Sequence, residues 1–205
     1  QEVIGKVEAM IAKVDAPQLK WQMAGYGRLF ADQEDLLVTG QLRSFAGAFG
    51  QIFIIMLLLW RTVPAAVISM LPNLAPLFFV FMLMGAAGIY LDMATVLIAG
   101  VVLGITVDDT IHIFYHYRMR RDKGAGVVFA IARSIETSGK AVLAVSLLLV
   151  SQFLLLSTSS FVPTSSFGLL AAIGLMSGQL LELLLLPALV VLWGRMKLRH
   201  PWLKI

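Results

Sequence analysis

Two adjacent carboxylates, Asp108 and Asp109, lie within a long apolar run and carry the most informative chemistry in this chain. A charged side chain at the centre of a membrane helix costs at least about 2.5 kcal/mol on insertion scales, so such residues are functional by default. Adjacent carboxyls also disfavour simultaneous ionisation, which favours a state in which one of them holds a proton. The pair therefore predicts a proton-binding centre, which a proton-coupled device needs.

Two histidines follow Asp108 at helical spacing. Asp108, His112 and His116 are each four residues apart, so a helix would place them on one stripe. The stripe favours a proton path, and the alternative is that both histidines only lie at the membrane interface. An Asp/His metal site would need further ligands close by. The sequence offers no compact set of them, so we expect neither a metal nor another cofactor.

Further polar and small residues lie in the same apolar runs. Glu182 lies midway along the last run and Ser146 in the run before it. We predict that Glu182 serves the proton centre. Ser146 and Ser151 are candidate donors to the acidic pair, although a serine in a membrane helix more often allows close packing or bonds its own backbone. Gly100 and Gly104 form a small-residue face that would let another helix approach the acids, with simple packing as the alternative.

The composition indicates that lipid is the main solvent of this chain. Of its 205 residues 59% are hydrophobic and only 14% are charged, which is too little polar surface for a soluble domain of this size. The net charge of +4 is better explained by cytoplasmic loops than by nucleic-acid binding. Cysteine is absent, which excludes a disulfide framework and a thiolate nucleophile within these residues. Because the first residue is Gln1, we expect a piece of a longer protein.

Five apolar runs are long enough to cross a bilayer, which takes about 20 helical residues. They define a five-helix transmembrane domain over residues 44–193, with spans at about 44–60, 64–88, 93–115, 139–158 and 166–193. Residues 122–138 carry an apolar stripe, which predicts a separate helix on the inner membrane surface. Residues 194–205 are expected to be a cytoplasmic tail.

The first 43 residues differ from the rest. Their apolar spacing predicts a short helix, a strand over Leu19 to Met23, and a helix from about Arg28 that leads into the membrane. We therefore expect residues 1–43 to be a small α/β remnant of a periplasmic domain with a pre-membrane helix. The fold class predicted for the whole chain is an all-α membrane protein with this remnant at its N-terminus.

Lysine and arginine indicate the orientation of the spans, because they accumulate on the cytoplasmic side. With five crossings, one side carries all of the following: Arg61, Arg118, Arg120, Arg121, Lys123, Arg133, Lys140, Arg195, Lys197, Arg199 and Lys204. The opposite connections, near Asp92 and over residues 158–165, contain neither residue type. This predicts a multi-pass protein of a bacterial inner membrane, with a periplasmic N-terminus and a cytoplasmic C-terminus.

Several short motifs together resemble the second membrane half of the resistance-nodulation-division (RND) superfamily, in the branch of MmpL-like and patched-like exporters. The motifs are Gly104-xxx-Asp108-Asp109, then Thr110-Ile111-His112, together with Leu71-Pro72-Asn73, Gly88-Ile89, Phe167-Gly168 and Leu186-Pro187-Ala188-Leu189. The resemblance implies a proton-driven exporter of hydrophobic or amphiphilic compounds, in which Asp108 and Asp109 move protons. It also implies a missing N-terminal half of the same transporter, contact with membrane lipids, and a monomer or homo-oligomer.

Two other functions compete with that of an exporter. Sterol-sensing proteins are related to this fold, so a lipid- or sterol-responsive sensor or scaffold is the alternative, and it would not need titratable acids. An intramembrane aspartyl protease is disfavoured, because adjacent acids on one helix point about 100° apart and cannot form a catalytic dyad. No nucleotide fingerprint or nucleophile–base pairing supports another enzyme class.

Overall fold

Helices are the regular secondary structure found among the described residues, and short turns connect them. The computed structural model describes residues 2–11, 25–90, 92 and 94–199. Its helices are α1 (Glu2–Ile11), α2 (Tyr26–Trp60), α3 (Val63–Ala87), α4 (Leu97–Asp122), α5 (Val127–Leu156) and α6 (Val162–Arg199). The last five are long and apolar enough to cross a membrane, which confirms the predicted set of five spans.

The α/β remnant expected at the N-terminus is not supported. No residue within the described ranges forms a strand, and the strand expected over residues 19–23 lies outside those ranges. The helix expected from about Arg28 begins at Tyr26 and continues to Trp60 without a proline to interrupt it. The pre-membrane helix and the first span are therefore one continuous helix, α2.

The helices end where the local sequence can reverse the chain. At the end of α2, Arg61 adopts a left-handed conformation with φ 57°, and its N–H donates to the Leu57 carbonyl at 2.7 Å. Pro64 then lies in the first turn of α3, where its missing N–H has no intrahelical partner to lose. Gly88, with φ 67°, ends α3 in the conformation that glycine adopts most readily.

The apolar stripe at residues 127–138 takes a different position from the one expected. These residues are not a separate surface helix but the first turns of α5, because no breaker separates them from the apolar run that follows. Ile131 is buried, and Val127 packs against Gly194 near the end of α6. Part of the stripe therefore packs on a neighbouring helix, while Val128 stays 60% exposed.

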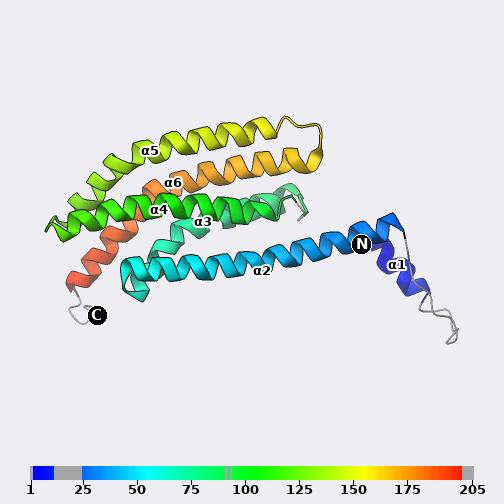
Figure 1. The fold of residues 1–205 in the computed structure, drawn as a ribbon, viewed down its shortest axis with the longest axis horizontal. Helices are drawn as coiled ribbons and strands as arrows, with labels where there is room; N and C mark the ends of the chain where they lie inside the picture. Colours follow the sequence, from blue (N-terminus) through cyan, green and yellow to red (C-terminus); the bar gives the residue numbers. More distant parts are fainter. Residues whose placement is uncertain (1, 12–24, 91, 93, 200–205) are drawn as a thin grey trace.

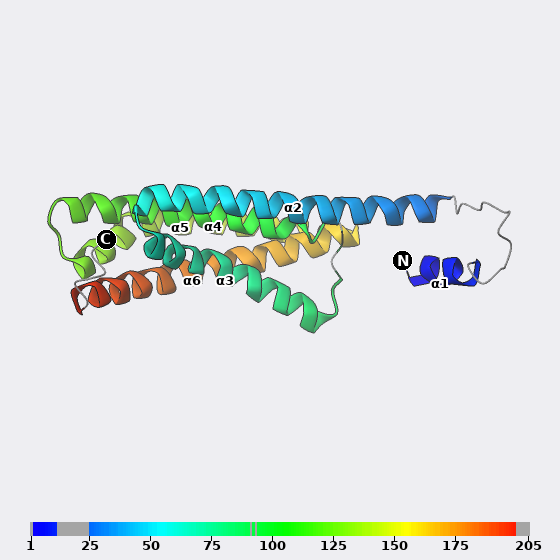
Figure 2. The same ribbon diagram turned by 90° about the horizontal axis from the view of Figure 1, so that it is seen from below.

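The bundle is built around α4. Figures 1 and 2 show α3, α4, α5 and α6 packed side by side, with α2 running along the outside. Within the apolar window of each span, 56% of the residues are buried in α4 but only 6% in α2. Of the five spans, α4 therefore has the largest share of residues that this fold shields from lipid.

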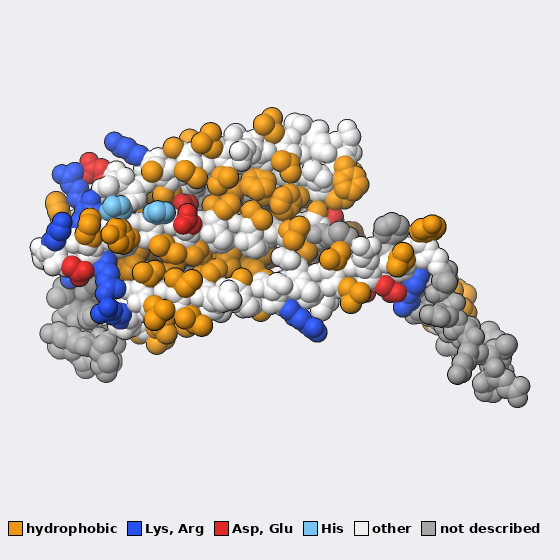
Figure 3. All heavy atoms as spheres, in the orientation of Figure 1, with side chains coloured by type: hydrophobic (Ala, Val, Ile, Leu, Met, Phe, Trp, Pro, Cys, Tyr) orange, Lys and Arg blue, Asp and Glu red, His pale blue; other side chains and the backbone are white. Residues whose placement is uncertain are grey.

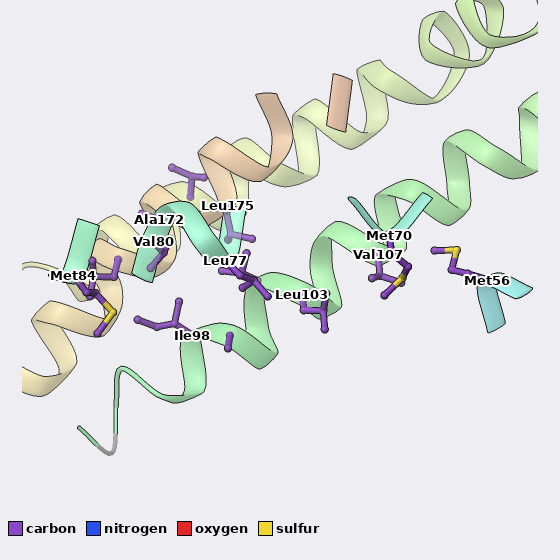
Figure 4. Packing of buried hydrophobic residues seen from close by; sticks show 14 of the residues in the cluster. Met56, Met70, Leu77, Val80, Met84, Ile98, Leu103, Val107, Ala172 and Leu175 are labelled. Atoms are coloured by element: carbon purple, nitrogen blue, oxygen red, sulfur yellow. The ribbon is translucent and has the colours of Figure 1, made fainter. Parts of the chain in front are cut away.

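Glycines of α6 approach side chains of α3 and α4 closely. A Cβ atom on Gly178 would lie 2.7 Å from Thr106 Cγ2, and one on Gly174 would lie 2.8 Å from Val102 Cγ2. Lipid tails are as apolar as leucine, so such dense packing, rather than escape from water, drives association of membrane helices. Figure 4 shows the resulting core, where Leu77 of α3 and Leu175 of α6 lie close together and Leu103 of α4 belongs to the same cluster.

Candidate functional site

The two adjacent aspartates face different surroundings. Asp109 is 7% exposed and lies inside the bundle, whereas the side chain of Asp108 is 72% exposed. Successive residues on a helix point about 100° apart, so only one of the pair can face the neighbours of α4 within this chain. The predicted acidic pair is thus one buried acid and one acid on an open face.

Glu182 is the second buried acid, and it joins the centre from α6. It is 1% exposed, and its Oε1 accepts a hydrogen bond of 2.8 Å from the Thr110 hydroxyl. Thr110, next to Asp109 on α4, is itself fully buried. Asp109 and Glu182 are near enough to interact electrostatically. The centre therefore holds one carboxyl group from each of two helices.

The contact between Thr110 and Glu182 follows from the small residues of α6. Gly174, Gly178 and Glu182 are four residues apart in turn and lie on one stripe of the helix. The two glycines let the backbone of that stripe lie directly against the Val102 and Thr106 side chains of α4. One turn further along, the Glu182 side chain reaches the Thr110 hydroxyl.

Asn73 on α3 completes the polar cluster, although its residue type and position did not lead to its prediction as a site residue. The Thr110 hydroxyl lies 3.1 Å from Asn73 Oδ1. Asn73 Nδ2 in turn donates to the Ser69 carbonyl at 3.0 Å, which fixes the orientation of the amide. An asparagine between two prolines of an apolar span, Pro72 and Pro76, was the signal that would have found it.

One oxygen of the buried Glu182 has no partner. Glu182 Oε2 is buried and accepts no hydrogen bond within the described part of the chain. In that same part, no lysine or arginine forms a salt bridge with Asp109 or Glu182. A buried ionised carboxylate without a cation is strongly unfavourable. The centre is therefore built so that a bound proton can remove its charge.

Ser146 does not reach the acids. Its hydroxyl donates to Gln179 Oε1 on α6, one turn before Glu182. Gln179 Nε2 is buried and has no hydrogen-bond partner among the residues described. The structure thus brings Ser146 to a second polar contact between α5 and α6, beside the acidic centre.

A small cavity extends from the acids along the predicted histidine stripe. It has a volume of about 230 Å³ between α4 and α5, and both aspartates, His112, His116 and Ser138 line it. His112 Nε2 lies 3.8 Å from Asp108 Oδ1, and both side chains are more than half exposed. Figure 3 shows an acidic side chain beside two histidines on a largely apolar face. The i, i+4, i+8 spacing therefore does place these groups around one cavity.

The predicted small-residue face of α4 is mostly open. A Cβ atom on Gly104 would meet no atom within 4 Å of the described structure, and one on Gly100 would lie 3.6 Å from Gln41 Nε2 on α2. Asp108, four residues after Gly104, continues the same open stripe. Among the described residues, no three His, Asp or Glu side chains gather as a metal site requires.

Two comparisons with known proteins bear on this site. The model of the MMPL family matches residues 1–204. A protein of Methanocaldococcus jannaschii, named as a membrane protein, is 32% identical over 144 residues. That alignment covers 70% of this chain but only 37% of the relative, so the chain spans well under half the length of the protein it matches.

Proposed function

This chain belongs to the MMPL family, and from that membership we propose that it is the membrane half of a proton-driven RND exporter. Its cargo would be hydrophobic or amphiphilic, lipid-like compounds. The observation that carries the proposal is the buried cluster of Asp109, Glu182, Thr110 and Asn73, which joins three helices through titratable and hydrogen-bonding groups. A protein that converts proton binding into helix movement needs such a junction.

Binding of a proton would change how α6 is held to its neighbours. With Glu182 ionised, the Thr110 hydroxyl donates to it, and the hydrogen bond links α4 to α6. With a proton on Glu182 Oε1, the carboxyl group becomes the donor and the Thr110 proton is released toward Asn73 Oδ1 on α3. The proton therefore selects between two hydrogen-bond arrangements across the same three helices, as a two-state element requires.

The histidine-lined cavity is the proposed route of the proton to that cluster. Asp108 and His112 lie at its open side, while Asp109 is its most buried acid. His116 Nδ1 is buried and has no hydrogen-bond partner among the described residues, so it is available to a water molecule or a proton. Proton transfer over the four-residue steps of this stripe would need only ordered water between the side chains.

The open face of α4 supports a partner in the full protein. An aspartate exposed to lipid is expensive, so the face that carries Gly104, Asp108 and His112 must be covered in a membrane. We propose that the N-terminal half of the same transporter covers it, and a further copy of the chain is the other candidate. A helix of either partner can pack closely on this face, because Gly104 has no side chain to keep it away.

The chain is a multi-pass membrane protein, and its orientation is part of the proposal. Lysine and arginine side chains gather at one end of the bundle in Figure 3, where α4 ends and α5 begins. The positive-inside rule places that end in the cytoplasm. We therefore propose an inner (cell) membrane location with the start of α2 and the α5–α6 connection outside.

Neutralising the two buried acids one at a time tests the function. The full native protein would be expressed in a host without other efflux pumps, and export of the lipophilic dye Nile red would be followed with and without a protonophore. Asp109→Asn and Glu182→Gln should each reduce proton-dependent export by at least about tenfold at unchanged membrane abundance. Asp122→Asn, an exposed acid at the end of α4, is the matched control and should export normally.

Export that survives both substitutions would contradict the exporter. If, in addition, sterol or lipid still promoted binding of a partner protein in those variants, a lipid- or sterol-responsive sensor would replace the exporter as the proposed function. The two functions are thus separated by whether the buried acids are needed.

A further inference from the structure

Four basic side chains converge on one cavity at the end of the bundle where α4 leads into α5. The cavity has a volume of about 530 Å³, and Arg120, Lys123, Arg133 and Lys140 line it. Arg120 lies in the last turn of α4 and Lys123 caps that helix, whereas the other two belong to α5. We call this cavity the basic pocket.

The charge of the basic pocket is not neutralised from within. Glu136 is the one acidic residue in its lining, and it pairs with Arg133 at 2.5 Å. Four cations and one carboxylate leave a net charge of +3. In the described part of the chain, neither Lys123 nor Lys140 forms an ion pair. Like charges held around one concave space repel each other, so an anion bound there would be stabilised.

A bias of loop charges toward one membrane face does not by itself produce this pocket. Lys140 is thirteen residues into α5, which is roughly 20 Å along the helix from Val127. It nevertheless lines the same cavity as Lys123, which precedes the helix. Topology explains how many cations lie at this end, whereas their convergence on one cavity calls for a ligand.

One cation of the pocket is already held in place. Arg120 Nη2 donates to Thr137 Oγ1 at 2.7 Å, and its Nη1 donates to the His116 carbonyl at 3.2 Å. The guanidinium therefore bridges α4 and α5 before any ligand arrives, which reduces the entropy lost on binding. Phe129 adds an apolar wall, with Arg133 5.9 Å from the centre of its ring.

We propose that the basic pocket binds the phosphate group of an anionic phospholipid headgroup. Lysine and arginine are the residues that bind phosphate oxygens, and basic pockets between helices at the membrane surface suit such headgroups. Phe129, 60% exposed beside the cations, would lie against the glycerol and upper acyl region. Free inorganic phosphate shares the charge but has no apolar part to use this wall. None of the four cations lines the cavity of the proton centre, and the site goes beyond the export function.

Lipid retention by the purified full native protein tests the proposal. Phosphatidylglycerol, phosphatidylcholine or inorganic phosphate would be added in a mild detergent, and bound lipid would be counted by native mass spectrometry. Phosphatidylglycerol should bind in preference to phosphatidylcholine. The double variant Lys123→Gln/Lys140→Gln should bind phosphatidylglycerol at least about tenfold more weakly, because each basic residue near a lipid surface adds about fivefold in affinity.

The matched control removes the same charge from the same end of the bundle. Arg61→Gln/Arg195→Gln changes two exposed cations that do not line the basic pocket, and it should retain wild-type binding. An equal loss of phosphatidylglycerol binding in both double variants would show only a general attraction between positive charge and anionic lipid, and it would overturn the proposal. So would unchanged binding in the lysine variant, or displacement of the lipid by an equal concentration of inorganic phosphate. All four cations are outside the proton centre, so Nile red export by each variant shows separately whether the export function holds.

Discussion

The Thr110 hydroxyl on α4 donates to Glu182 Oε1 on α6 over 2.8 Å, although 72 residues separate them in the chain. The Thr110 oxygen also lies 3.1 Å from Asn73 Oδ1 on α3 and 3.2 Å from the Thr106 carbonyl. A hydroxyl has one proton to donate, so it cannot satisfy all three acceptors together. In the function proposed above, the protonation state of Glu182 decides which acceptor receives the Thr110 proton.

Replacement of Thr110 by valine should disable this junction. Thr110→Val removes the hydroxyl with little change in volume and leaves a buried Glu182 oxygen without its donor, which costs about 1–3 kcal/mol. We expect a lower melting temperature in detergent and at least about tenfold slower Nile red export. Thr110→Ser keeps the hydroxyl and should behave nearly as the wild type. A valine variant with wild-type export would remove Thr110 from the mechanism.

A methyl group at Gly178 should push α6 away from α4. The added Cβ would lie 2.7 Å from Thr106 Cγ2, and both helices are held by the surrounding core, so overpacking should cost about 1–3 kcal/mol. We expect Gly178→Ala to melt at a lower temperature in detergent. Gly85→Ala is the matched control, because its Cβ would meet nothing within 4 Å and alanine favours the helix. Equal melting temperatures for the two variants would contradict the close approach.

Loss of the imidazole at His112 should affect export but not stability. His112 and Asp108 are 3.8 Å apart and mostly exposed, so their pairing contributes little to folding, roughly 0.5 kcal/mol or less. If the stripe carries protons, His112→Gln should slow export several-fold while the melting temperature stays within about one degree of the wild type. Unchanged export would instead assign His112 to the membrane interface.

The orientation can be read by cysteine labelling, because these 205 residues contain no cysteine of their own. Ser160 lies in the connection between α5 and α6, and Asp122 ends α4 at the opposite end of the bundle (Figure 1). A membrane-impermeant maleimide should label Ser160→Cys in intact cells, and Asp122→Cys only after the cells are permeabilised. The unsubstituted protein measures background labelling. The reverse pattern would invert the topology.

Much of the fold follows from the order of residues, because span length and hydropathy are local properties. Five apolar runs of sufficient length predicted the five helices of the bundle, and the structure contains them. Whether residues 127–138 form a separate surface helix or the first turns of a span was not predictable in this way. An apolar stripe there is compatible with lipid or with a neighbouring helix, and α6 decided between them.

The same limit applies to the candidate site. Residue types and positions identified Asp108, Asp109 and Glu182, since a charged residue inside an apolar span is conspicuous in any sequence. They did not reveal that Asp109 turns inward while Asp108 stays on an open face, nor that Ser146 bonds Gln179. They did not connect Thr110 with Glu182 and Asn73.

Sequence alone thus determined which titratable and polar groups the membrane helices carry, and tertiary structure decided which of those groups contact one another. The reason is that helix periodicity fixes the angle between neighbouring side chains but not the direction of the bundle centre. That direction depends on which helices can pack closely together. Here the glycines of α6 allow α6 to pack against α4 on the side of Asp109 and Thr110. Contacts between residues 37 and 72 positions apart form only once the helices have packed.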